Sequence, residues 1–117
     1  MDEVQEKVFQ VLCDHAAHIM DGWMPFPCHL IAKQAGLSEY KTRKALKALV
    51  KDGYAVHAKT VINTEDYSLP YHGFNIGMMA YDTPQYRAAC EREAEICAEC
   101  FGGTKESYLR AFLKFRG

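Results

Sequence analysis

The stretch from Leu30 to Tyr54 limits the fold of this chain more than any other. It contains two helical patterns joined by a short turn, Gly36-Leu37-Ser38. Gly36 can take the left-handed backbone conformation with which a helix commonly ends. Ser38 can accept hydrogen bonds from the first free amides of the next helix, which makes it a good N-cap. The sequence therefore predicts two helices joined by a tight turn.

The second helix is expected to run from Ser38 to about Asp52, where Gly53 ends it. Its apolar positions form a narrow stripe: Ala45, Leu46, Leu49 and Val50. Its basic side chains lie mostly off that stripe: Lys41, Arg43, Lys44 and Lys47. A helix, a tight turn and a basic helix make the helix-turn-helix arrangement, whose second helix enters a DNA major groove.

This segment resembles the winged helix-turn-helix of bacterial transcription regulators and is similar to GntR-like ones. Three runs carry the resemblance: Ile31-Ala32-x-x-Ala35-Gly36-Leu37-Ser38, Arg43-Lys44-Ala45-Leu46-x-x-Leu49 and Asp52-Gly53-Tyr54. Thr42 departs from the family pattern, in which this position is usually apolar, and Glu39 stands where a basic or small residue is common. The resemblance implies a mainly α fold with a small β-hairpin wing (α+β), extended here by added C-terminal helices.

A hairpin is expected after the second helix, with strands over residues 54–62 and 74–81. The turn-rich connection over 63–73 would form the tip of the wing. Glu65 and Asp66 occupy that tip without any Lys or Arg, so the tip is poorly suited to phosphate. The wing contacts expected on DNA are therefore His57 and Lys59, nearer the strand.

Three further helices are predicted: over residues 2–20, over 84–101 after the Thr83-Pro84 start signal, and after Thr104. Trp23 and Phe26, in the connector after the first helix, are interpreted as core residues. We divide the chain into a winged helix-turn-helix domain (1–82) and a C-terminal helical extension (83–117). The resemblance implies that the extension forms a homodimer. The alternative is that these helices pack on the first helix of their own subunit, where the basic last helix could also lie against the acidic first helix.

Charge is segregated along the 117 residues, although the net charge is only −1. Residues 28–59 carry seven basic and two acidic residues, a net +5, whereas residues 60–103 carry two basic and seven acidic, a net −5. A local positive block of this kind can steer a protein toward phosphate. A merely solvated helix face is the alternative interpretation.

The length suits a single domain, and no apolar run is long enough to span a membrane. No export signal is visible, and an odd number of cysteines, five, suggests no disulfide framework. We therefore expect a cytoplasmic protein.

No catalytic motif is evident, so we expect no enzyme and no cofactor. Cys97-Ala98-Glu99-Cys100 is a single CxxC motif, and zinc usually requires four such ligands. We favour small core or interface residues over a metal site here. If a metal binds, its candidate ligands are His15, His18, Cys90, Cys97 and Cys100.

The leading hypothesis is a transcriptional regulator that binds double-stranded DNA in a sequence-specific manner. The candidate DNA-binding residues are Ser38, Tyr40, Lys41, Thr42, Arg43, Lys44, Lys47 and Lys59. Tyr40, Lys41 and Lys44 are expected to reach base edges, while Arg43 and Lys47 hold phosphate. Ser38 and Thr42 are expected to help with contacts to the DNA backbone or with capping the helix. Two alternatives remain: a winged-helix protein-interaction module of a phage or host assembly, and a metal-responsive regulator.

Overall fold

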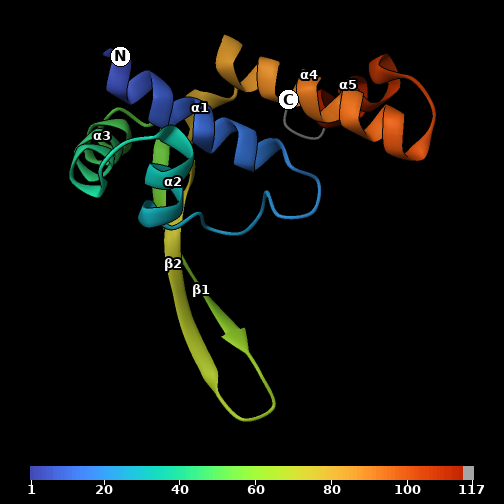
Figure 1. Cartoon of the computed structure of the whole chain (residues 1–117). Coiled ribbons are helices and arrows are strands. Elements are labelled where there is room, and N and C mark those ends of the chain that lie inside the picture. The colour runs from blue at the N-terminus through green and yellow to red at the C-terminus, as the bar shows by residue number, and fades with distance from the viewer. Residues whose placement is uncertain (115–117) are drawn as a thin grey trace.

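The computed structural model describes residues 1–114, which form five α-helices, a short 3-10 helix and a two-stranded antiparallel hairpin. In chain order these elements are α1 (Glu3–Ala17), α2 (Cys28–Ala35), α3 (Glu39–Lys51), β1 (Ala55–Asn63), β2 (Ser68–Ile76), η1 (Met78–Ala80), α4 (Pro84–Phe101) and α5 (Lys105–Lys114). Figure 1 shows the helices gathered into a body from which the hairpin projects. The predicted α+β class, with helices and one hairpin, is confirmed.

Local capping chemistry sets the ends of the helices. Gly36 ends α2 with a φ of 69°, and the Ser38 hydroxyl accepts a hydrogen bond from the Lys41 amide at the start of α3. The Thr83 hydroxyl accepts from the Tyr86 amide, so α4 begins at Pro84 as predicted. Each of these caps satisfies or replaces backbone groups that a helix end leaves unpaired.

The core forms around α1, which packs against α2, α3 and α4. Its largest fully buried aliphatic and aromatic side chains are Val8, Phe9, Leu12, Ile31, Leu46, Leu49 and Tyr86. The core therefore draws on α2, α3 and α4 together with α1. Among the described residues, no helix combines the length and apolar character needed to cross a membrane.

The C-terminal helices are attached through α4. On α1, Glu6 accepts a hydrogen bond of 2.9 Å from Gln85, and Asp14 forms an ion pair with Arg92. α5 packs mainly on α4, where Lys105 lies 3.4 Å from Glu95. The last helix therefore lies mainly against α4, whereas the sequence alternative placed it against the acidic first helix.

The structure corrects the predicted return strand. β2 spans Ser68–Ile76 instead of 74–81, so the tip connection covers only residues 64–67. Met78 to Ala80 form the 3-10 helix η1 instead of extending the strand. The error arose because the turn-like composition of residues 70–73 concealed a strand.

Some predicted core positions are also wrong. Trp23 is 69% exposed, whereas Phe26, from the same connector, is buried. Val50 is exposed although it was assigned to the apolar stripe of its helix, because it lies toward the solvent side. Trp23 projects from the surface and donates a hydrogen bond to the Met20 carbonyl instead of filling the core.

The hairpin has two halves with different surroundings. At its base, Phe26 and Phe74 exchange two backbone hydrogen bonds of 2.9 Å, which tie β2 to the connector before α2. Beyond that base, residues 61–70 are all exposed. We call residues 61–70 the arm, and the remainder of the described structure the body.

Candidate nucleic-acid interface

The solvent-facing side of α3 is the strongest candidate for a binding surface. The opposite side of the helix is anchored in the core by its buried residues, Thr42, Ala45, Leu46 and Leu49. Helical spacing of three and four residues then gathers one set of exposed side chains on the outer side. We call these four residues, Tyr40, Lys44, Lys47 and Lys51, the basic face.

The structure separates the predicted contact residues of α3 into three groups. Tyr40, Lys44 and Lys47 lie on the basic face. Lys41 lies toward α1, where it lines a shallow pocket of about 390 Å³ together with Asp2, and Tyr40 and Lys44 border the same pocket. Arg43 lies on the opposite flank, 3.9 Å from Glu39 in an exposed ion pair.

Two predicted contact residues have structural roles in the fold. Ser38 is the N-cap of α3, as the sequence predicted. Thr42 has no exposed surface, so its assignment as a DNA-binding residue is wrong. Its hydroxyl also has no hydrogen-bond partner among the described residues. Thr42 therefore occupies the apolar position that the resemblance implied, but with a buried hydroxyl group.

A groove separates the Arg43 flank of α3 from the base of the hairpin. It measures about 510 Å³ and includes side chains from α2, α3 and both strands. The polar side chains that line it are His29, Glu39, Arg43, His57 and His72. His57 Nε2 lies 3.4 Å from His72 Nδ1 across the two strands.

Strand register fixes which hairpin side chains face this groove. His57 is paired with Phe74, and Lys59 with His72. Directly opposite residues share a face of a sheet, and successive residues alternate between faces. His57, Lys59 and His72 therefore lie on one face of the hairpin, the face that lines the groove.

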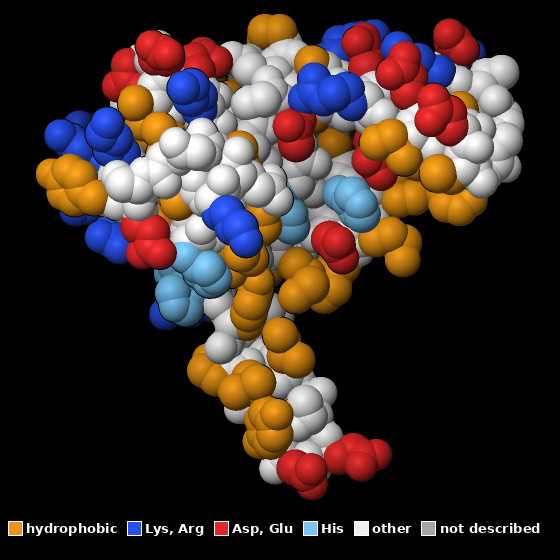
Figure 2. Space-filling view, in the orientation of Figure 1, with side chains coloured by type: hydrophobic (Ala, Val, Ile, Leu, Met, Phe, Trp, Pro, Cys, Tyr) orange, Lys and Arg blue, Asp and Glu red, His pale blue; other side chains and the backbone are white. Residues whose placement is uncertain are grey.

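Acidic residues of the hairpin lie far from this surface. Glu65 and Asp66 occupy the connection at the end of the arm, which contains no Lys or Arg. Figure 2 shows these acids at the free end of the projecting hairpin, while one group of histidines lies where the hairpin leaves the body, near Lys and Arg side chains. The positive surface of α3 and the negative arm tip are thus separate features.

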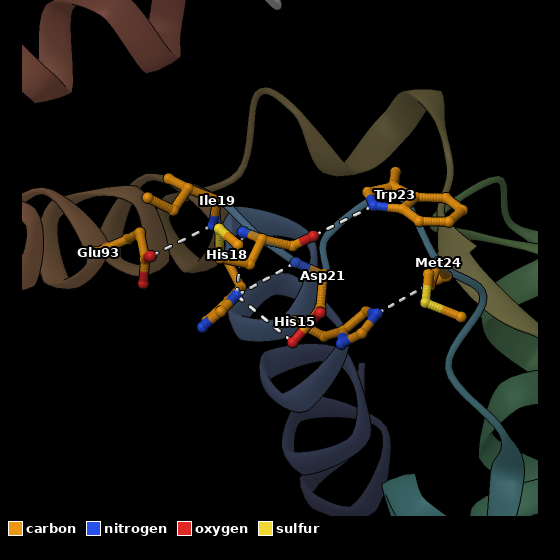
Figure 3. A network of polar contacts seen from close by, with 8 residues as sticks. His15, His18, Ile19, Asp21, Trp23, Met24 and Glu93 are labelled. Carbon is orange, nitrogen blue, oxygen red and sulfur yellow. Dashed lines mark hydrogen bonds and ion pairs between the residues drawn. The ribbon is translucent and has the colours of Figure 1, made fainter.

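The two histidines proposed as metal ligands are engaged in local contacts. His15 Nε2 lies 2.7 Å from the Met24 carbonyl, and because a carbonyl only accepts, this nitrogen carries the proton. His18 Nδ1 accepts hydrogen bonds from the amides of Met20 and Asp21. Figure 3 shows these contacts fastening the loop after α1, which the buried Glu93 also holds by accepting from the Ile19 amide.

The candidate cysteine ligands are not brought together with these histidines. Cys90 and Cys97 are buried in α4, whereas Cys100 is exposed. Burial raises the pKa of Cys90 to about 11 and also raises the pKa of Cys97, which disfavours the thiolate that a metal requires. Within residues 1–114, no three Cys, His, Asp or Glu side chains are grouped so that they could hold a metal ion.

Three residues of this region were missing from the predicted contacts. Lys51 follows Lys47 by four residues and so continues the basic face by one helical turn. His29 and His72 join the groove only through the packing of α2 and the strand register. Lys51 could therefore have been found from the helical spacing of the sequence. The two histidines could be found only from the three-dimensional structure.

Comparison with known proteins gives no match to a family model, to a curated protein or to a solved structure.

Proposed function

We propose that this protein binds double-stranded DNA in a sequence-specific manner and regulates transcription. The observation that carries the proposal is the basic face of α3, where three lysines project to solvent without an acidic residue among them. The side opposite this face is packed in the core, so α3 can present the face as a rigid surface. A helix held in this way has the form needed to enter a major groove.

The proposal gives the individual residues different roles. Tyr40 and Lys44, in the first half of α3, are the candidates for base edges. Lys47 and Lys51 are the candidates for phosphate on the same face. Arg43 lines the histidine-lined groove, and Lys59 lies on the hairpin face that carries His57 and His72. Both are candidates for a second stretch of backbone phosphate.

A salt titration tests this proposal directly. Fluorescence anisotropy would measure binding to mixed-sequence duplex DNA by the wild type and by a Lys44→Ala/Lys47→Ala/Lys51→Ala variant. Each lost phosphate contact should reduce the slope of log affinity against log salt by about 0.9. We expect weaker binding and a flatter slope for the variant.

A matched control removes the same charge elsewhere. Lys7, Lys33 and Lys105 are lysines outside the proposed interface, and their replacement by Ala should leave most of the slope in place. Equal losses in the two triple variants would show that total charge, and not α3, determines binding. A folded wild type that fails to bind duplex DNA at low salt would contradict the proposal.

The arm favours a second candidate function, a protein-interaction module. Its exposed apolar side chains and acidic tip suit a protein surface better than a phosphate backbone. If DNA binding fails while deletion of the arm abolishes a protein complex, this second function replaces the first.

A further inference from the structure

The arm carries exposed apolar side chains that its own chain leaves uncovered. Val61 is 56% exposed, Tyr67 57% and Leu69 47%. Figure 2 shows apolar side chains following the projecting hairpin down to its acidic end. A hairpin of two strands is only marginally stable on its own in water, so an additional strand would stabilise this one.

The outer edge of β2 is closed to such a strand. Near the base, Phe74 directs its N–H and C=O away from β1 and bonds Phe26. Because the direction of the backbone N–H and C=O groups alternates along a strand, these groups of residues 72, 70 and 68 also point away from β1. Pro70 stands at one of these positions and has no N–H to offer, which is a common way to block an exposed strand edge.

The outer edge of β1 is open. Phe74 pairs with His57, so the same alternation directs the backbone groups of His57, Lys59, Val61 and Asn63 away from β2. Within residues 1–114, these outward groups make no backbone hydrogen bond. β1 therefore presents a row of unpaired donors and acceptors beside the apolar arm, which is a template for strand addition.

Charge selects the direction of the added strand. Lys59 lies toward the base of the arm, whereas Glu65 and Asp66 lie at its tip. If a second β1 were added in parallel, the two acidic tips would lie side by side and repel each other. If it were added antiparallel, Lys59 of each copy would lie near the acidic tip of the other, which is favourable.

We propose that β1 pairs antiparallel with β1 of a second copy of this chain, around a two-fold axis near Val61. The product is a four-stranded sheet made from two hairpins, with each copy contributing the same surface. Antiparallel pairing of identical edges requires a two-fold axis perpendicular to the sheet. The faces that carry His57 and Lys59 therefore lie on the same side of the dimer.

Blocking the open edge tests the proposal. Val61 is paired with Pro70, and its N–H points away from β2, so Val61→Pro removes an outward donor without removing a hydrogen bond of the hairpin. Val61→Thr is the matched control because it keeps the N–H and a β-branched side chain. Sedimentation equilibrium should show dimers for the wild type and Val61→Thr, and monomers for Val61→Pro.

A charge exchange tests the same contact without introducing proline. Lys59→Glu alone should weaken the dimer by about fivefold, since each contact occurs twice about the axis. Combining Lys59→Glu with Glu65→Lys and Asp66→Lys should restore association. Circular dichroism would check that every variant is folded.

Cross-linking locates the axis. In a Cys100→Ser background, which removes the exposed native thiol, Val61→Cys should form a disulfide between two copies under mild oxidation. Ser68→Cys is the control, because it also lies in the arm but on the β2 edge, and it should not form this disulfide.

Several results would overturn the proposal. A wild type that stays monomeric at high concentration would do so, as would a dimer that survives Val61→Pro. The second result would assign the dimer to another surface, such as the C-terminal helices. Capture of a different protein by the arm of a monomeric wild type would also exclude the symmetric pairing.

Discussion

The inner and outer halves of the hairpin share one strand register but have different environments. At the base, Ala55 is paired with Ile76, and both are buried against the helices. At the outer end, Asn63 is paired with Ser68, and both are exposed. Backbone pairing thus continues unchanged where side-chain burial stops. The position of the arm is therefore fixed by the contacts between its base and the body, because within the described part of the chain no packed side chains fix it farther out.

Truncating one leucine in the core and one in the arm should give the largest difference between body and arm in the free energy of unfolding. Leu46→Ala should reduce the free energy of unfolding by about 3 kcal/mol, because Leu46 is fully buried and its truncation leaves a cavity. Leu69→Ala removes the same atoms from the exposed arm and should change that free energy by less than about 0.5 kcal/mol. Urea denaturation at low protein concentration would measure both effects.

Similar losses for the two leucines would show that the arm contributes to the core of the folded monomer. A larger loss for Leu69→Ala that appears only at high protein concentration would instead report self-association through the arm.

Alkaline pH should destabilise the body through its buried thiols. Burial raises the pKa of Cys90 from 9.0 to about 11, and it also raises the pKa of Cys13. Between pH 9.0 and about pH 11, the Cys90 thiol keeps its proton in the folded state and loses it in the unfolded state. The free energy of unfolding should therefore fall by about 1.4 kcal/mol per pH unit for each such thiol.

Denaturant titrations between pH 8 and pH 10.5 would measure this slope. Cys90→Ala should make the slope shallower, whereas Cys100→Ala, at an exposed position, should leave it unchanged. An identical slope in all three proteins would show that other groups control alkaline stability.

The smallest expected effect concerns the buried side of α3. Thr42→Val replaces an unpartnered hydroxyl by a methyl group of similar shape and should stabilise the body by about 1 kcal/mol. Thr42→Ser keeps the hydroxyl and loses a methyl group, so it should be destabilising. Thermal unfolding would compare the two variants, and a destabilising Thr42→Val would indicate that a water satisfies the hydroxyl.

Features determined by local sequence were predicted well. The Ser38 cap, the Gly36 stop and the Thr83-Pro84 start depend on residues within one helical turn, and the structure confirms them. β2 was misplaced because Pro70 suggested a turn, although a proline can stand on the outer edge of a strand. Trp23 was misplaced because its side-chain chemistry favours burial, while its surroundings depend on tertiary packing.

The candidate interface shows the same division. Helical periodicity identified much of the basic face, because the spacing of residues along α3 determines which of them share a side. It did not identify the groove, where His29 and His72 come together from segments far apart in the chain. Thr42 was misassigned because a threonine suits both a surface and a β-branched core position.

The exposed, two-stranded form of the arm limits how its length can vary in evolution or by design. Side chains alternate between faces with a period of two, so a change of one residue per strand would invert every position beyond it. Removing Val61 and Ile62 together with Leu69 and Pro70 preserves that alternation. His57, Lys59 and His72 would keep their positions beside α3. Arms of different length on this body should therefore differ by an even number of residues in each strand.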